Sequence, residues 1–122
     1  MKKSSSVYWF IVALLAAVAA TLLLLSHMLT DPGKVIIQLG GDCGKNYYTF
    51  LFHSLYGNGS WFQGMNYPYG EHIIYSDGQP ILSVLLSHFK GISMQQALAC
   101  MNLAIAFSYI TGILFTYLIL LR

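Results

Sequence analysis

Charged residues are scarce in this sequence. Asp, Glu, Lys and Arg together make up 8% of the 122 residues, whereas 57% of the residues are hydrophobic. A water-soluble domain carries about 25% charged residues, so this composition excludes an ordinary soluble domain. Only four carboxylate side chains are present, those of Asp31, Asp42, Glu71 and Asp77. Any acid–base chemistry must therefore draw on very few groups.

Cysteine is equally scarce, since Cys43 and Cys100 are the only two. Two cysteines do not make a disulfide framework, and these two can pair only if the region around Cys43 folds back onto the segment that holds Cys100. We favour two unpaired residues. Spacings typical of metal ligands, such as C-x-x-C or H-x-x-x-H, are absent from the sequence, so no metal or other cofactor is evident.

The hydrophobic residues are concentrated in two long uncharged segments. Residues 7–29 are long enough to cross a hydrocarbon core about 30 Å thick as a helix, and residues 97–121 form a second such segment. The first is too long for the apolar region of a secretory signal peptide, which runs about 7–15 residues, so we favour a retained anchor. Ser93 and Gln96 form a capping-box pattern that moves the predicted second span to residues 94–121.

The basic residues indicate an orientation for the two spans. Lys2 and Lys3 precede the first span, Arg122 closes the second, and positive residues near span ends tend to stay in the cytoplasm. We therefore predict a cytoplasmic tail at residues 1–6, both termini in the cytoplasm, and an outer loop at residues 30–93. The expected location is a bacterial inner membrane, with membrane lipid as a partner and no nucleic acid.

The outer loop is expected to contain two amphipathic helices at the membrane surface. At residues 45–56, apolar side chains recur at helical spacing on one face, and the opposite face carries aromatic residues and the polar tip of His53. Asp42 or Asn46 is the expected N-cap. The second helix is predicted at residues 80–90, with a proline in its first turn. The fold class is therefore all-α, with two transmembrane helices joined by an extracytoplasmic loop.

Two further segments of the loop have expected conformations. Residues 35–39 are rich in Val, Ile and Leu, and we expect a short strand-like or extended stretch that ends at the glycine pair Gly40–Gly41. Residues 57–80 are rich in Gly, Asn, Tyr and Pro. Their aromatic content argues against disorder, so this segment is expected to form an ordered loop.

The polar residues of the loop are the candidates for chemistry. A carboxylate near a membrane surface, partly desolvated by neighbouring aromatic rings, is able to act as a general base, and Asp42 is the best candidate. Aromatic rings stack on sugars, while carboxylates and amides bind sugar hydroxyl groups, so the loop suits a carbohydrate or a lipid-linked phosphate. The residues that we expect to contact substrate are Lys45, Tyr47, Glu71, His72 and Asp77.

Plainer roles compete with these assignments. Asp42 suits the capping of the helix behind it, and Lys45 suits a contact with solvent or a lipid headgroup. Glu71 and His72 follow a Tyr-Gly pair and suit a turn, and Asp77 precedes a glycine in an ordinary turn dipeptide. Residue types alone therefore define a two-span membrane protein with a structured outer loop.

The order of these features resembles the start of the GT-C membrane glycosyltransferases. The stretches GGDCGKNYYTFLFHSLYGNGSWF and NYPYGEHIIYSDGQPILSVLLS are also similar to uncharacterised multi-span bacterial membrane proteins related to that superfamily. GT-C enzymes transfer a sugar from a polyprenyl-phosphate donor to an acceptor at the outer face of the membrane, and an aspartate of the first outer loop removes the acceptor's hydroxyl proton. The resemblance implies this role for Asp42, with a divalent metal in some members.

GT-C enzymes have many more than two spans. We therefore expect this chain to be the amino-terminal part of a longer glycosyltransferase, inactive by itself, with a lipid-linked sugar donor as its substrate. The alternative is a non-catalytic two-span membrane protein whose aromatic outer loop binds a partner or lipid headgroups. A small transporter subunit is a weaker alternative, because the spans carry no acid or base apart from His27.

Overall fold

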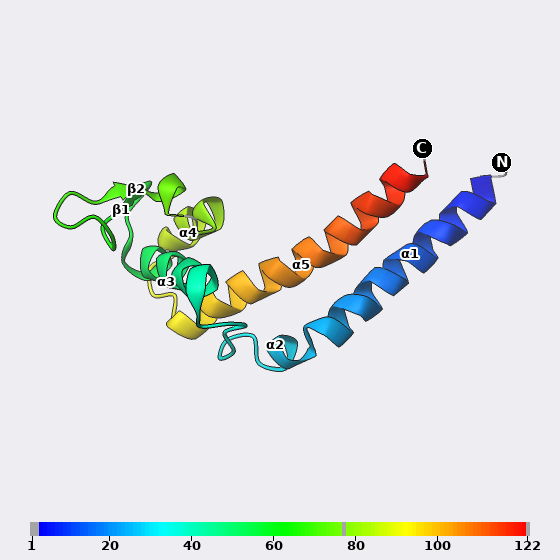
Figure 1. Cartoon of the computed structure of the whole chain (residues 1–122), viewed down its shortest axis with the longest axis horizontal. Helices are drawn as coiled ribbons and strands as arrows, with labels where there is room; N and C mark the ends of the chain where they lie inside the picture. The colour runs from blue at the N-terminus through cyan, green and yellow to red at the C-terminus, as the bar shows by residue number, and fades with distance from the viewer. Residues whose placement is uncertain (1–2, 77, 122) are drawn as a thin grey trace.

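The structure, a computed structural model, describes residues 3–76 and 78–121. Two long helices, α1 (Lys3–Leu24) and α5 (Met94–Leu120), lie side by side and form what we call the stem, with both chain ends at the same end of the molecule (Figure 1). Residues 31–93, which we call the head, lie at the opposite end (Figure 1). The described chain is mostly helical, and α1 and α5 are long and apolar enough to cross a membrane.

The boundaries of the stem helices differ in part from the predicted spans. α5 begins at Met94, and the predicted capping box is present: the Ser93 side chain accepts from the Gln96 backbone N–H, and the Gln96 side chain accepts from the Ser93 backbone N–H. The first span was predicted to run to residue 29, but α1 ends at Leu24 and a separate short helix, α2 (Ser26–Thr30), follows. Apolar composition continues across this break and therefore gave no signal for it.

The two predicted surface helices are present. The first, α3 (Gly41–Tyr56), starts four residues before the predicted position, and its N-cap is Gly40 rather than Asp42 or Asn46. Gly41 has a φ of +61°, a conformation that glycine adopts readily, and this allows the chain to turn sharply into the helix. The second, α4 (Pro80–Ser87), has its proline in the first turn as predicted and ends before the predicted residue 90.

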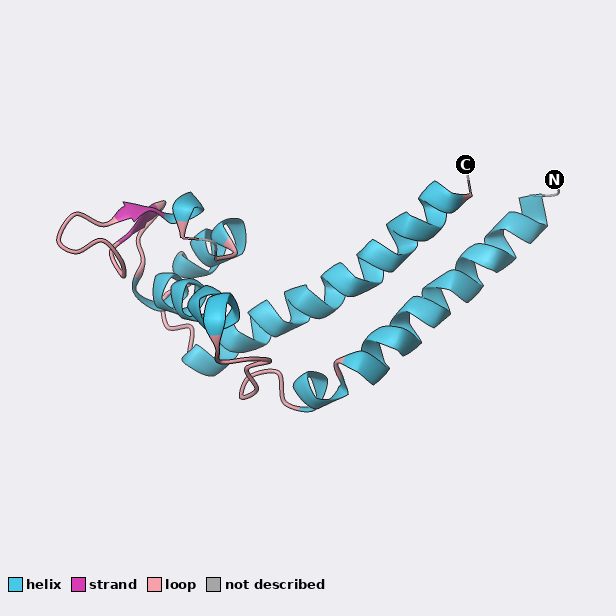
Figure 2. Cartoon of the chain, viewed as in Figure 1, coloured by secondary structure: helices cyan, strands magenta, loops and turns pink. Residues whose placement is uncertain are grey.

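A small hairpin occupies the part of the head farthest from the chain ends (Figure 2). Its strands, β1 (Trp61–Phe62) and β2 (Glu71–His72), pair antiparallel with Trp61 opposite His72, and a short 3-10 helix, η1 (Ile73–Tyr75), follows. Residues 57–80 therefore contain regular structure within the ordered loop that was expected. Residues 35–39, expected as a short strand-like or extended stretch, form no strand and run as irregular chain up to the Gly40–Gly41 pair.

The core of the molecule lies where the head meets α5. α3 packs against both α4 and α5. The buried apolar side chains of this cluster are Tyr47, Phe50, Leu51, Leu86, Ala97, Leu98 and Met101. Each large apolar side chain buried here contributes about 1.5–3 kcal/mol. Cys43 and Cys100 lie partly buried against the same cluster as free thiols, as predicted.

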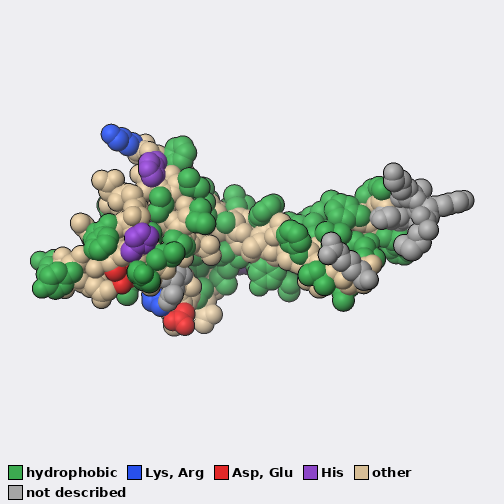
Figure 3. All heavy atoms as spheres, turned by 90° about the horizontal axis from the view of Figure 1, so that it is seen from above, with side chains coloured by type: hydrophobic (Ala, Val, Ile, Leu, Met, Phe, Trp, Pro, Cys, Tyr) green, Lys and Arg blue, Asp and Glu red, His purple; other side chains and the backbone are tan. Residues whose placement is uncertain are grey.

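Among the side chains that the structure describes, the charged ones lie on the head, whereas the stem is mainly apolar. On the face shown in Figure 3, the charged and histidine side chains lie over the head, and the described part of the stem presents mainly hydrophobic side chains. Residues such as Leu23, Phe107 and Leu120 are largely exposed on the stem. An exposed apolar surface of this extent is characteristic of protein that faces lipid.

Candidate functional site

The proposed base, Asp42, lies in the first turn of α3. Its side chain is 95% exposed, and its Oδ1 atom is 3.8 Å from the Nζ atom of Lys45. The expected partial desolvation by aromatic neighbours is therefore wrong, because the carboxylate is almost fully exposed. An exposed ion pair of this kind contributes about 0.2–1 kcal/mol, so it orients the carboxylate more than it stabilises the fold.

A second Asp–Lys pair provides a natural comparison for the first. Asp31 and Lys34 also lie three residues apart, and the Nζ atom of Lys34 donates to Oδ2 of Asp31 at 2.8 Å. This hydrogen bond raises the pKa of Lys34 above its ordinary value. The pair lies in the turn that follows α2, whereas Asp42 and Lys45 lie on a helix that is packed against α5. The two pairs therefore differ in the element that carries them, a turn for Asp31 and Lys34 and a helix for Asp42 and Lys45.

Asn102 on α5 connects the head to the stem. Its side chain is fully buried, and its Nδ2 atom donates to the backbone oxygens of Pro32 at 2.7 Å and Val35 at 2.8 Å. Its Oδ1 atom accepts a hydrogen bond from the hydroxyl group of Tyr47. We call these three hydrogen bonds the Asn102 network. One amide thus fixes both the chain that leaves the first stem helix and the third helix onto α5.

Tyr47 has this structural role instead of the expected contact with substrate. The side chain is 2% exposed, so its ring and hydroxyl group face the core. Burial raises the pKa of its phenol above the ordinary value, because the charged form loses its hydration. A neutral hydroxyl group suits its position as the donor to Asn102. The assignment of Tyr47 to substrate binding is therefore replaced by a role in positioning α3.

Glu71 and His72 lie in β2, and both engage their neighbours. The Nδ2 atom of Asn66 donates to Oε2 of Glu71 at 2.6 Å, which closes the loop between the two strands. The Nδ1 atom of His72 accepts from the backbone N–H of Ile74 at 3.3 Å. These contacts fit the turn role that the sequence allowed. Asp77, the remaining expected substrate contact, lies outside the described residues.

The structure separates the expected site residues into two groups. The hairpin packs against the C-terminal part of α3, where the rings of Phe52 and Phe62 meet edge to face with centroids 5.7 Å apart. Asp42 lies ten residues earlier on the same helix, which corresponds to about 15 Å at 1.5 Å per residue. Asp42 and Lys45 are therefore together at one end of α3, and Glu71 and His72 are near the other end.

His53 was expected at the surface, but it is fully buried. Its Nε2 atom is 2.9 Å from the backbone oxygen of Gly59, whereas its Nδ1 atom is buried without a hydrogen-bond partner. Burial lowers the pKa of the imidazole below its ordinary value, and the hydrogen bond to Gly59 opposes this shift. The prediction failed because β1 covers the face of α3 that was taken to be open.

A cavity of about 220 Å³ lies beside His53. Its walls come from the end of α3, the turn that follows it, and β1. The lining residues are Phe52, His53, Tyr56, Gly57, Asn58, Trp61, Phe62 and Gln63. Four of the eight are aromatic and two are carboxamides. This combination of apolar walls with a few polar groups is typical of a small-molecule site.

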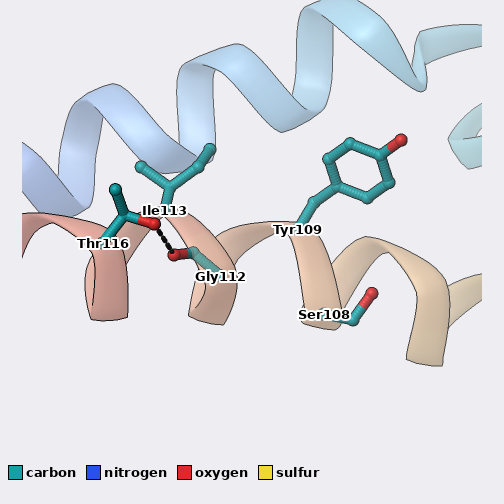
Figure 4. Close-up of a pocket in the computed structure, with 5 residues that line it drawn as sticks. All are labelled: Ser108, Tyr109, Gly112, Ile113 and Thr116. Carbon is teal, nitrogen blue, oxygen red and sulfur yellow. Dashed lines mark hydrogen bonds between the residues drawn. The ribbon is translucent and has the colours of Figure 1, made fainter.

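A second hollow lies on the stem, along the part of α5 nearer its C-terminus. Its volume is about 470 Å³, and its lining includes Ser108, Gly112 and Thr116, which recur every four residues on one face. Tyr109 and Ile113 point toward α1, and Thr116 donates to the backbone oxygen of Gly112 at 2.9 Å (Figure 4). Small residues at this spacing permit close approach of another membrane helix.

Sequence reasoning missed Asn102 and the burial of His53. Asn102 did carry a signal, because an amide inside an otherwise apolar membrane helix is costly unless it is hydrogen-bonded. His53 carried no comparable signal, since its burial depends on the chain returning through β1. Among residues 3–76 and 78–121, no group of three or more His, Cys, Asp or Glu side chains is arranged to hold a metal ion.

The geometry thus defines a two-helix hairpin of membrane-spanning length with a folded head at one end. Comparison of this chain with protein-family models, with curated proteins and with solved structures finds no match. The observations that bear on function are therefore the exposed carboxylate of Asp42 and its support on α3, the aromatic cavity beside His53, and the Asn102 network.

Proposed function

We propose that this chain forms the amino-terminal membrane hairpin of a polyprenyl-phosphate-sugar-dependent glycosyltransferase, in which Asp42 is the catalytic base. The chain is inactive alone, since the remaining helices of such an enzyme supply the donor site. In this proposal α1 and α5 cross a bacterial inner membrane, both termini are cytoplasmic, and the head lies outside. The substrates are a lipid-linked sugar and a hydroxyl-bearing acceptor.

The observation that carries the proposal is an accessible carboxylate on a helix that is packed against α5. Asp42 lies within the first turn of α3, and the hydrogen bond from Tyr47 to Asn102 attaches that helix to α5 one and a half turns later. The carboxylate is 95% exposed and so is open to an acceptor. A catalytic group needs this kind of fixed support together with access.

The proposed reaction is a substitution at the anomeric carbon of the donor sugar. The Asp42 carboxylate accepts the proton of the acceptor's hydroxyl group as the oxygen attacks that carbon. The new carbon–oxygen bond forms as the bond to the polyprenyl phosphate breaks, and the phosphate leaves with the bonding electrons. Lys45 orients the Asp42 carboxylate through the 3.8 Å contact.

The test is sugar transfer in membranes from the source cell, with the variant placed in the chromosomal gene that encodes this chain. We expect Asp42→Asn to lower the rate of transfer from radiolabelled polyprenyl-phosphate sugars by about 10²–10⁴-fold, the usual contribution of a general base. The variant keeps the shape of the side chain, so the amount of protein in the membrane should not change.

Asp31→Asn is the matched control, because it also removes an acid from an Asp–Lys pair with a three-residue spacing. It should leave the rate of transfer within about twofold of the unaltered protein, as expected for a surface pair. Equal loss of transfer in both variants, or full transfer with Asp42→Asn, would contradict the assignment of Asp42 as the base.

A second candidate function, binding of lipid headgroups or a partner by the head, is favoured by a separate observation. Large aromatic side chains project from the hairpin region into solvent, and the most exposed of them are Tyr67 at 92%, Tyr69 at 83% and Tyr75 at 74%. Amphipathic rings of this kind are at home at a membrane interface. Loss of liposome binding after replacement of these tyrosines with serine, with sugar transfer absent throughout, would favour this function.

A further inference from the structure

The helix α4 exposes apolar side chains where a helix in water exposes polar ones. Ile81 and Leu85 lie one turn apart on the same face, and Phe89 follows at the end of the helix. These three side chains, which we call the outer face of α4, are 79%, 56% and 66% exposed. Ser83, in contrast, is 1% exposed and so is buried as deeply as Leu86 of the core cluster. An exposed apolar patch of this kind marks a contact with lipid or protein.

The polar side chains in and just after α4 bond to the backbone of their own helix. The Oγ atom of Ser83 donates to the backbone oxygen of Pro80 at 3.1 Å, and the Oγ atom of Ser87 donates to that of Val84 at 2.8 Å. The Nδ1 atom of His88 lies 2.7 Å from the same Val84 oxygen. The sequence of α4 itself contains no charged residue. A helix that bonds its polar groups internally in this way is suited to a surrounding without water.

An apolar hollow continues the outer face of α4 toward η1. Its volume is about 320 Å³, and Ser60 and His72 line it together with side chains of α4 and η1. The aliphatic residues of the lining are Ile73, Ile74, Ile81, Val84 and Leu85. The side chain of Ile74 is 61% exposed, so the apolar surface extends from α4 onto its neighbour. Such a hollow is one that the acyl chain of a lipid can enter.

The other surface helix, α3, has a different exposed face, although both helices were expected at the membrane surface. Asp42 on α3 is 95% exposed. Tyr48 is 49% exposed, and its hydroxyl group donates to the backbone oxygen of Gly64 at 3.2 Å. An ionised carboxylate is costly inside a membrane, so water suits this part of α3. Lipid suits the outer face of α4.

The position of α4 in the chain and in the molecule brings it close to the outer end of α5. Phe89 precedes Met94, the first residue of α5, by five residues, which extend over at most about 18 Å. Met94 is itself 56% exposed. In Figure 1, α4 lies on the side of α3 toward which the stem rises, whereas the loop of the hairpin points away from the stem. The helix α4 is therefore within reach of a bilayer that surrounds the stem.

We propose that the outer face of α4 is embedded in the outer leaflet of the membrane and holds the head against the bilayer. Lys90 is exposed beside Phe89, where its ammonium group is able to reach the phosphates of anionic lipids while its apolar stem follows the acyl chains. The inference rests on the membrane location given in the proposed function and not on the catalytic role of Asp42. It differs from lipid binding by the hairpin tyrosines, because α4 and not the hairpin enters the lipid.

The experiment measures quenching of tryptophan by lipid in the full chain, reconstituted into vesicles of phosphatidylcholine and phosphatidylglycerol. The quencher is phosphatidylcholine with bromine atoms on its acyl chains, placed either near the headgroup or near the chain ends. Trp9→Phe together with Trp61→Phe removes both native tryptophans. Leu85→Trp in this background reports on the outer face of α4, and Phe107→Trp, at a position 67% exposed on α5, is the reference for a membrane span.

We expect bromine near the headgroup to quench Leu85→Trp strongly, as an interfacial helix requires. Bromine near the chain ends should quench Phe107→Trp more, because thirteen residues of helix, about 20 Å, separate that position from Met94. Quenching of Phe107→Trp without quenching of Leu85→Trp would overturn this inference and leave the location of the stem intact. Quenching of neither would contradict the membrane location itself, and this inference with it.

Two further outcomes would identify a different contact. The chain with Trp9→Phe alone reports on the hairpin through Trp61, and quenching there in place of Leu85→Trp would overturn α4 in favour of the hairpin. Emission of Leu85→Trp that is shifted to shorter wavelength, but is not quenched by either lipid, would indicate that protein covers the outer face. A second copy of the chain would then be the occupant, and the inference would be overturned.

A matched pair of charge substitutions tests whether the apolar character of the outer face is what holds α4 in the lipid. Ile81→Trp is the reporter, in the same background. Leu85→Asp should remove most of its quenching, because a carboxylate on a lipid-facing surface is costly. Gln63→Asp adds the same charge at an exposed position of the hairpin and should leave the quenching unchanged. An equal effect of both substitutions, or of neither, would contradict the inference.

Discussion

The two halves of α5 are the same kind of apolar helix, but they have different surroundings. In the half near the head, Ala97, Asn102 and Ala106 are at most 7% exposed. In the half near the C-terminus, none of residues 107–121 is buried. α1 repeats the contrast, because Ala17 and Thr21 are at most 2% exposed, whereas none of residues 7–16 is buried. Contacts within the protein therefore hold the half of the stem near the head in place. The packing of the other half depends on the lipid or protein that surrounds it.

This difference separates two sources of stability. The head and the adjoining part of the stem bury apolar side chains and satisfy polar groups internally, as the Asn102 network illustrates. The remaining stem exposes a face with Ser108, Gly112 and Thr116, where a bilayer or further membrane helices would complete the packing. Substitutions in the first region should therefore change the stability of the chain itself, and those in the second should not.

The largest expected effect is that of Asn102→Leu. This variant leaves two backbone oxygens and the Tyr47 hydroxyl group without their partner, which should lower the free energy of unfolding of the head by about 3–5 kcal/mol. Urea unfolding of the micelle-bound chain, followed by Trp61 fluorescence in a Trp9→Phe background, measures it. Gln38→Leu, at an exposed amide in the loop before α3, is the control and should cost less than about 1 kcal/mol. If the two variants had equal free energies of unfolding, the role of Asn102 in connecting the head to the stem would be contradicted.

An intermediate effect is expected from a matched pair of substitutions on α5. Ala106→Leu adds volume where α1 and α5 are packed, and it should destabilise the packing of these two helices by about 1–3 kcal/mol. A Cβ at Gly112 would meet nothing within 4 Å, and glycine inside a helix costs about 1 kcal/mol, so Gly112→Leu should cause no loss of stability and at most a gain of about 1 kcal/mol. The same unfolding measurement compares the two. If Gly112→Leu lowered the free energy of unfolding more than Ala106→Leu does, the open half of the stem would already be packed in the isolated chain.

The smallest expected effect is that of pH, through His53. Burial lowers its pKa in the folded head, so below its ordinary value of about 6.5 the unfolded chain binds more protons than the folded chain. Stability should therefore be constant above about pH 7.5 and fall with acidification below about pH 6.5, by at most about 1.4 kcal/mol per pH unit. Urea midpoints between pH 5 and 8 measure the slope.

His53→Gln should abolish this slope, and His88→Gln should keep it, because the His88 side chain is exposed at the end of α4. Retention of the full slope in folded His53→Gln protein would assign the pH dependence to another group. The comparison therefore tests burial at His53 without reference to any ligand.

The sequence predicted those parts of the fold that depend on neighbouring residues. The capping box at Ser93, the proline that opens α4 and the glycine that follows α3 act within one helical turn, so their consequences are visible in a short window of sequence. Length and apolar composition likewise identified both stem helices. Their exact ends depended on more than composition, as the break at Leu25 demonstrates.

The sequence could not predict features that depend on distant residues. Asn102 is 70 positions from Pro32 and 55 from Tyr47, and nothing local to any of these residues identifies its partner. The burial of His53 depends in the same way on β1, and the high exposure of Asp42 depends on how α3 is oriented on α5. The candidate site was therefore predictable as a set of residue types, but its division between the two ends of α3 was not.

The span of 70 residues between Pro32 and Asn102 also constrains how a nascent chain matures. Ribosomes add about 5–20 residues per second, so the amide that receives the earlier segments is made about 4–14 s after them. Throughout that delay the first helix has already been made, while Pro32, Val35 and Tyr47 lack the side chain that holds them to α5. Attachment of the head to the stem therefore comes after the head has been synthesised, and it is timed by the translation of α5.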